Sequence, residues 1–152
     1  MMMHELMWKT AKKVIKNLKN PLLIILRLLL FFLRSIFFDQ YYKEFTMQEF
    51  KEAIEKFKQY AEEKQLHYEN EFYDCDDFAL EFKTFCSREL KHNGVGVAIG
   101  ILSQNKRILG GHAWNIVAIQ GELWYFEPQT YDLFKGDVSP DGFKYTLLNV
   151  IW

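Results

Sequence analysis

Three residues that lie far apart in the chain have the chemistry of a nucleophilic site. His112 and Glu127 lie within residues 110–130 (GGHAWNIVAIQGELWYFEPQT), which alternate like two short strands joined near positions 120–121. A two-residue turn there places both side chains on one face and on a diagonal of roughly 7 Å. An imidazole held by a carboxylate needs only a nucleophile, and Cys75 can supply it.

The sequence places Cys75 in the first turn of a helix. Asp74 is a good N-cap, the apolar residues that follow recur at helical spacing to Leu90, and Asn93-Gly94 has the form of a left-handed C-cap. The backbone N–H groups and the positive dipole end at a helix start stabilise a thiolate. Cys86 lies about 16 Å further along the helix, beyond disulfide reach, and we interpret it as a core residue.

Three acidic residues surround the cysteine: Asp74, Asp76 and Asp77. A helix N-terminus favours acidic residues in any case, but carboxylates are also ligands for hard cations, so these three are a candidate calcium site. Zinc held by the thiol, the imidazole and the glutamate is an alternative, although no second cysteine or histidine completes such a set. The predicted chemistry requires no cofactor, and calcium is a possible ligand of these three acids.

The first 40 residues differ from the rest. Five lysines in residues 9–19 precede an apolar segment, 21–38, which contains 14 Leu, Ile and Phe residues but also Arg27 and Arg34. On an insertion scale the apolar residues contribute roughly −4 to −8 kcal/mol and the two arginines cost about 5 to 7 kcal/mol, so the sum is near zero. Because the arginines are seven residues apart, they share one side of the helix, which suits an anionic membrane interface.

We therefore predict a membrane-associating segment over residues 1–40, inserted or in the membrane plane and attached through residues 9–38. A very apolar helix buried in an oligomer is the alternative. The 152 residues suffice for one well-packed domain, and the net charge of −1 gives no indication of nucleic-acid binding. Beyond Asp39 the composition is that of a soluble domain.

Residues 45–152 are predicted to form an α+β domain in which helices pack on an antiparallel sheet. Thr46 and Glu49 form a capping box, and apolar residues at helical spacing continue to about Lys64. The cysteine helix follows, and residues 95–102 (VGVAIGIL) have the composition of a buried strand. The two strands with His112 and Glu127 come next, and a last strand is expected near the C-terminal end.

Three motifs carry a resemblance to a known family: DCDDFAL at 74–80, GHAWNIV at 111–117, and G-x-x-W-x-x-[acid]-P at 121–128. Together they resemble the transglutaminase-like superfamily, and most closely its bacterial transglutaminase-like cysteine peptidases. The resemblance implies a papain/transglutaminase-like core with Cys75 as nucleophile, His112 as base and Glu127 as orienting acid. Glu127 stands where that family usually has aspartate.

The chemistry implied by this resemblance is acyl transfer through a thioester. The Cys75 thiolate attacks an amide carbonyl, and His112 passes the proton to the leaving amine while Glu127 holds its tautomer. With water as acceptor and a protein or peptide substrate, the chain is predicted to be a cysteine peptidase or amidase; an amine acceptor would make it a transglutaminase. A non-catalytic binding module on the same fold remains the alternative, since Cys75 and His112 alone are also typical core residues.

Overall fold

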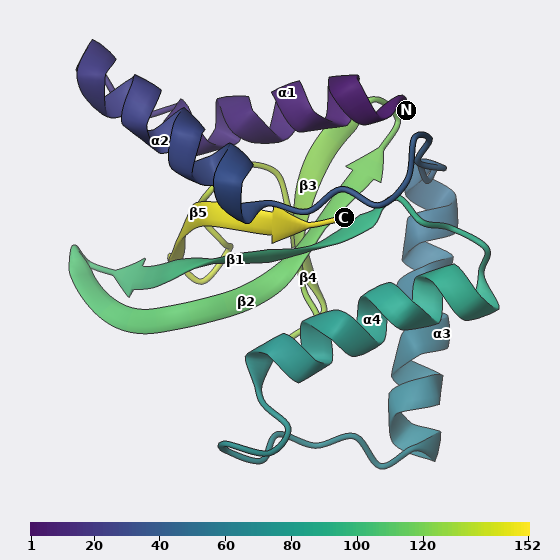
Figure 1. Cartoon of the computed structure of the whole chain (residues 1–152). Helices are drawn as coiled ribbons and strands as arrows, with labels where there is room; N and C mark the ends of the chain where they lie inside the picture. Colours follow the sequence, from purple (N-terminus) through teal and green to yellow (C-terminus); the bar gives the residue numbers. More distant parts are fainter.

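A computed structural model describes all 152 residues, which form four helices and one five-stranded antiparallel sheet (Figure 1). The helices are α1 (Met3–Ile15), α2 (Pro21–Arg34), α3 (Met47–Glu63) and α4 (Cys75–Glu89). The strands are β1 (Val95–Gln104), β2 (Arg107–Ile119), β3 (Glu122–Glu127), β4 (Asp132–Phe134) and β5 (Lys144–Ile151), in the spatial order β4-β3-β2-β1-β5.

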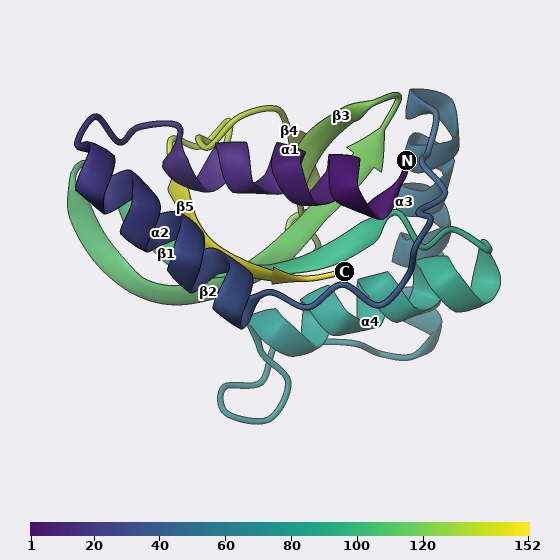
Figure 2. The ribbon, with the colours of Figure 1, turned by 45° about the horizontal axis from the view of Figure 1, so that its top comes forward.

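The sheet is covered on both faces. Helices α1 and α2 lie over one face, and α3 and α4 lie over the other (Figures 1 and 2). The alternation of side chains along β2 explains this arrangement, because Trp114 and Ile116 belong to the cluster under α1 and α2 whereas Val117 and Ile119 belong to the cluster with α3 and α4. A strand buried on both faces accounts for the continuous apolar run in β2.

The predicted helix starts are confirmed. The Thr46 hydroxyl accepts a hydrogen bond from the backbone N–H of Glu49 at 3.2 Å, and the Glu49 carboxylate accepts one from the N–H of Thr46 at 2.7 Å. Asn20 caps α2 by accepting from the N–H of Leu22 at 2.9 Å, directly before Pro21. In both helices a local sequence signal marks the first turn.

Helix α2 is shorter than the predicted segment 21–38. It ends at Arg34, and Ser35 adopts an extended conformation with φ −89° and ψ 144°. Ile36 then pairs with the last strand, since its N–H donates to the carbonyl of Val150 and its carbonyl accepts from Trp152, both at 2.9 Å. None of the helices combines the length and the apolar composition needed to span a bilayer.

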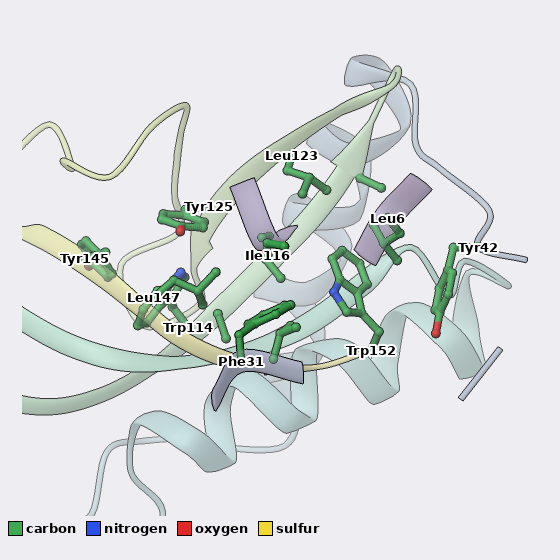
Figure 3. Close-up of a cluster of buried hydrophobic side chains, with 14 of the residues drawn as sticks. Leu6, Phe31, Tyr42, Trp114, Ile116, Leu123, Tyr125, Tyr145, Leu147 and Trp152 are labelled. Carbon is green, nitrogen blue, oxygen red and sulfur yellow. The ribbon is translucent and has the colours of Figure 1, made fainter. Parts of the chain in front are cut away.

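The core beneath α1 and α2 contains both buried tryptophans of the chain (Figure 3). Leu6 of α1 and Phe31 of α2 are fully buried there, beside Trp114 of β2 and Trp152 at the C-terminal end. The two N-terminal helices therefore contribute to the same core as the sheet. The division of the chain into a segment 1–40 and a domain 45–152 stays a prediction.

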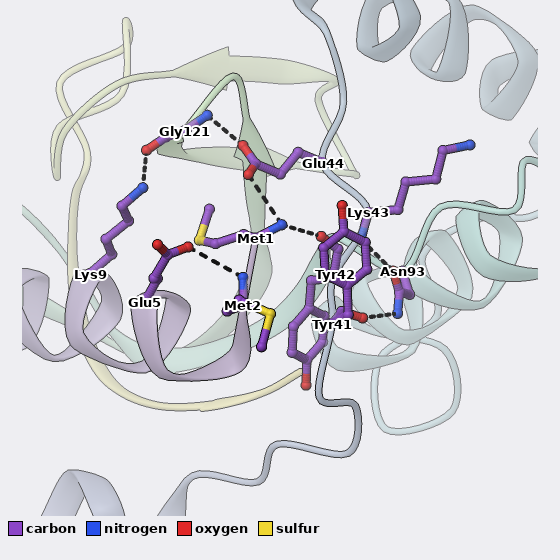
Figure 4. Close-up of polar contacts among 10 residues, drawn as sticks. All are labelled: Met1, Met2, Glu5, Lys9, Tyr41, Tyr42, Lys43, Glu44, Asn93 and Gly121. Atoms are coloured by element: carbon purple, nitrogen blue, oxygen red, sulfur yellow. Dashed lines mark hydrogen bonds and ion pairs between the residues drawn. The ribbon is translucent and has the colours of Figure 1, made fainter.

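A set of polar contacts fastens the start of α1 to the chain before α3 and to the β2–β3 turn (Figure 4). The backbone nitrogen of Met1 donates to the carbonyl of Tyr42 at 2.7 Å and lies 3.3 Å from the carboxylate of Glu44. Glu44 also accepts from the N–H of Gly121, whose carbonyl accepts from Lys9. These contacts hold the turn that sets the register of the site strands.

Candidate functional site

The β2–β3 hairpin has the turn and the register expected from the sequence. Gln120 and Gly121 form a two-residue turn with φ values of 47° and 80°, the geometry of a type I′ turn. Asn115 pairs with Phe126, so the next pair along brings Glu127 opposite Trp114. This register places Glu127 and His112 on the same face, one diagonal step apart.

His112 and Glu127 form a buried pair. The His112 Nε2 lies 2.6 Å from the Glu127 carboxylate, and Glu127 is only 4% exposed. The hydroxyl of Tyr145, on β5, donates to the same carboxylate oxygen at 3.2 Å, and the N–H of Gln129 donates to the other at 3.3 Å. Several donors therefore fix this carboxylate.

Cys75 approaches this pair from the start of α4. Asp74 is the N-cap, and the cysteine packs on a small apolar cluster of Ala79, Val97 and Ala113, next to His112 in the chain. Burial lowers the pKa of His112, but the hydrogen bonds to Cys75 and Glu127 and the negative charges of these two groups outweigh it and raise the pKa to about 9. At neutral pH the imidazole of His112 is therefore protonated beside the Cys75 sulfur.

The second cysteine is in a different environment. Cys86 is fully buried among phenylalanines of α3 and α4, and burial raises the pKa of its thiol far above the ordinary value. The structure therefore agrees with the interpretation of Cys86 as a core residue, and only Cys75 faces polar groups.

The three acids near Cys75 do not act together. Donor atoms of Asp74, Cys75 and Asp76 lie within 4.8 Å of one another, but Asp77 turns back to accept from the N–H of Asp74 at 3.2 Å as part of a capping box. Calcium takes six to eight oxygen ligands, and two carboxylates and a thiol supply few of them. The calcium site at Asp74, Asp76 and Asp77 stays a prediction.

A polar hollow opens on the other side of His112. Its volume is about 160 Å³, and Cys75 does not line it. It is lined by His112 and Glu127 together with residues of the β3–β4 turn, β4, the segment before β5, β5 and the end of β1. The other lining residues are Leu102, Gln129, Thr130, Asp132, Ser139, Asp141, Phe143 and Tyr145.

Comparison with known proteins identifies the family. Residues 39–139 match the model of the ricin-type beta-trefoil lectin C-terminal domain. The chain belongs to this family. Two solved lectin structures share its fold: a PSL1a-E64 complex, with 23% identity and a TM-score of 0.56, and the Polyporus squamosus lectin bound to the epitope Neu5Aca2-6Galb1-4GlcNAc, with 19% identity and a TM-score of 0.52. Each alignment covers 78% of this chain and 42% of the lectin, and no curated protein sequence matches the chain.

Membership of this lectin family corrects several expectations. The assignment to the transglutaminase-like superfamily is wrong, and with it the papain/transglutaminase-like core and the identification as a cysteine peptidase or amidase, because the family model and both structures belong to lectins. The assignment was wrong because the three motifs are short segments within residues 74–128. They specify a cysteine at a helix start and a histidine–acid pair on a hairpin, which different folds can provide. The catalytic roles of Cys75, His112 and Glu127 stay predictions.

Sequence reasoning missed the residues that complete the site of this lectin-family chain. Tyr145, which bonds Glu127, comes from β5, and its place beside the hairpin depends on a pairing of β5 with β1 that no local signal reveals. Gln129, Asp132 and Asp141 follow turns and look like ordinary loop residues in the sequence. The only available hint was their concentration within a few residues of Pro128 and of the Ser139–Gly142 turn.

Proposed function

We propose that this chain is a carbohydrate-binding module of the lectin type and that its sugar site is the hollow beside His112. The proposal is supported by the family of the chain and by the chemistry of the hollow, which lies where the β3–β4 turn and the segment before β5 meet the sheet. The chain spans 42% of the length of the solved lectins, so the site is argued from its own residues.

The lining of the hollow suits a ligand rich in hydroxyl groups. Gln129, Asp132 and Asp141 offer planar amide and carboxylate groups that accept or donate in fixed directions, as sugar hydroxyls require. Phe143 supplies an aromatic surface on which an apolar sugar face can pack. This combination of a few convergent polar groups with an aromatic wall carries the proposal.

The charges in the hollow select among sugars. Glu127, Asp132 and Asp141 bring three carboxylates against one imidazole, so the local field repels an acidic ligand. We therefore expect a neutral sugar such as the disaccharide Galb1-4GlcNAc, which forms the neutral part of the epitope bound by the Polyporus squamosus lectin. A terminal Neu5Ac carries a carboxylate and is expected to weaken binding.

Titration calorimetry of the full chain with Galb1-4GlcNAc and with Neu5Aca2-6Galb1-4GlcNAc tests this proposal. Gln129→Ala and Asp141→Ala should each weaken binding of the disaccharide about 3- to 10-fold, the effect of one hydrogen bond. Gln59→Ala, an exposed glutamine on α3, is the matched control and should bind like the natural chain. Absence of binding to either sugar, or tighter binding of the sialylated one, would refute the hollow as the sugar site.

We propose a second property, a reactive thiol at Cys75, because one specific observation favours it. The imidazolium of His112 beside Cys75 at a helix N-terminus is the setting in which protein thiolates are nucleophilic. Glu127 hydrogen-bonds the His112 ring, and Tyr145 in turn hydrogen-bonds Glu127. In this proposal the thiolate displaces iodide from iodoacetamide, forming a thioether and releasing iodide.

Mass spectrometry after limited treatment with iodoacetamide tests the thiol, with E64, the compound named in the PSL1a structure, as a second probe. Cys75 should be modified and Cys86 should not, and His112→Ala should slow the modification of Cys75 about tenfold or more. Thr84→Ala, at an exposed position of the same helix, is the control. Equal modification of the two cysteines, or an unchanged rate in His112→Ala, would exclude a site organised by His112.

A further inference from the structure

Helix α2 is apolar on two opposite sides, and the fold uses only one of them. On the inner side Phe31 is fully buried and Leu28 packs against the core. On the outer side Ile25 is 64% exposed and Leu33 is 72% exposed. The exposed apolar residues of the helix are Leu22, Leu23, Ile25, Leu26, Leu29, Phe32 and Leu33. A contiguous apolar stripe of this kind on a soluble domain marks a contact surface.

Helix α1 extends this surface and adds positive charge. It lies beside α2 (Figure 2), and Trp8 packs edge-on against Phe32 with ring centroids 6.0 Å apart while remaining 57% exposed. Lys12, one helical turn after Trp8, is exposed, as are Lys16 and Lys19 in the connection to α2. The apolar stripe is thus bordered by cations along α1, as in helices that lie in membrane interfaces.

The distribution of charge along the chain distinguishes between partners. Residues 1–38 contain seven basic residues and one acidic residue, whereas residues 39–152 contain 12 basic and 19 acidic residues. The basic character is therefore concentrated on the two helices that carry the apolar stripe. A second copy of the chain would bring the same positive charge to this face, so the field favours an anionic partner instead.

A basic hollow between α1, α2 and the sheet provides room for an anionic headgroup. Its volume is about 120 Å³, and its charged lining consists of Lys13, Lys16, Arg27 and Lys144 against a single acid, Asp137. Burial lowers the pKa of Lys13 to about 8, and a second nearby lysine contributes in the same direction. A phosphate or carboxylate bound in this hollow would neutralise part of the positive charge of these lysines and Arg27.

We propose that the outer face of α2, with Trp8 and the flanking lysines, docks in the plane of an anionic lipid membrane. The exposed leucines enter the apolar boundary of the bilayer, and the exposed lysines Lys12, Lys16 and Lys19 contact acidic headgroups. The helix stays on the sheet during docking, because withdrawing it would expose Phe31 and open the core. This proposal is independent of the sugar site and of the thiol.

Co-sedimentation of the full chain with vesicles tests this proposal. Binding is expected to vesicles of phosphatidylcholine mixed with phosphatidylserine and to be much weaker with phosphatidylcholine alone. Neutralising two lysines in Lys12→Gln/Lys19→Gln should weaken binding about 30-fold, since each lysine near such a surface contributes about fivefold. Ile25→Asp/Leu29→Asp should abolish it.

Matched controls separate docking from general effects. Phe72→Asp/Ile108→Asp changes two apolar residues that are 79% and 69% exposed elsewhere on the molecule, and it should bind like the natural chain. Urea denaturation of every variant checks that the fold is retained. Equal binding to both vesicle types, or unchanged binding of Ile25→Asp/Leu29→Asp, would overturn the proposal. The proposal would also be overturned if sedimentation velocity shows a dimer and Ile25→Asp/Leu29→Asp dissociates it. In that case a second copy of the chain covers the outer face of α2.

Discussion

The ionisation of His112 is the property of the site that a single experiment can test most directly. The hydrogen bonds to Cys75 and Glu127 raise the pKa of His112 to about 9 against the opposing effect of burial. The substitutions Cys75→Ala and Glu127→Gln should therefore each lower the pKa of His112. In the double variant only burial remains, so the pKa should fall below the ordinary value of about 6.5.

The contribution of His112 to the free energy of unfolding follows from the difference between its folded and unfolded pKa values. A folded pKa of about 9 against an unfolded value of about 6.5 corresponds to about 3 kcal/mol for a side chain that is 12% exposed. Because the folded pKa is raised, this stabilisation is fully present below pH ~6.5 and is lost as the pH rises through about 9. The Glu127→Gln chain should lose much of this pH dependence.

Two measurements check the reasoning. NMR titration of labelled imidazoles gives the pKa of His112, which is assigned by its absence in His112→Gln. Urea denaturation between pH 6 and pH 10 gives the stability, and it must be compared between variants because Lys13, with a pKa of about 8, titrates in the same range. A pKa of His112 near 6.5 in the natural chain, or one above 8 in the double variant, would refute the coupling of these three side chains.

Three further predictions concern the scaffold, and urea denaturation measures each of them. Phe31→Ala should destabilise the fold by about 3–5 kcal/mol because a fully buried aromatic ring is lost, whereas Phe72→Ala, 79% exposed, should change stability by less than about 0.5 kcal/mol. Thr46→Ala should cost about 1 kcal/mol by removing the cap of α3, and a change near zero would show that tertiary packing alone starts this helix. Gly100→Ala should destabilise by about 1–3 kcal/mol or more, since a Cβ there would lie 2.1 Å from the carbonyl oxygen of Thr146 on the neighbouring strand; full stability would mean that β1 and β5 separate easily.

The sequence contained the local information for parts of this structure. The turn at Gln120-Gly121 determines the register of β2 and β3, and this register brings His112 to Glu127. The capping box at Thr46 and the N-cap at Asp74 mark where α3 and α4 begin. Each of these features depends on residues within a few positions of one another, and for that reason a pattern can reveal it.

Features that depend on distant residues were not accessible in the same way. Helix α2 stops at Arg34 because Ile36 pairs with Ile151, a contact across most of the chain that no local pattern encodes. Tyr145 joins the site only because β5 lies next to β1. The family assignment was wrong for a related reason. A cysteine at a helix start and a histidine–acid pair on a hairpin describe a local arrangement, and they do not determine which helices pack on the other face of the sheet.

The pairing of Ile36 with Ile151 and the burial of Leu6 and Phe31 beside Trp152 have a consequence for the order of folding. The hairpins β1–β2 and β2–β3 join neighbouring segments and can form early, whereas α1 and α2 need the end of β5 to complete their core. During synthesis these helices emerge before the sheet does, and they find their partners only when β5 has followed. Their leucines are thus exposed until the ribosome has synthesised β5, and in this interval the protein depends most on a chaperone or a surface to prevent aggregation.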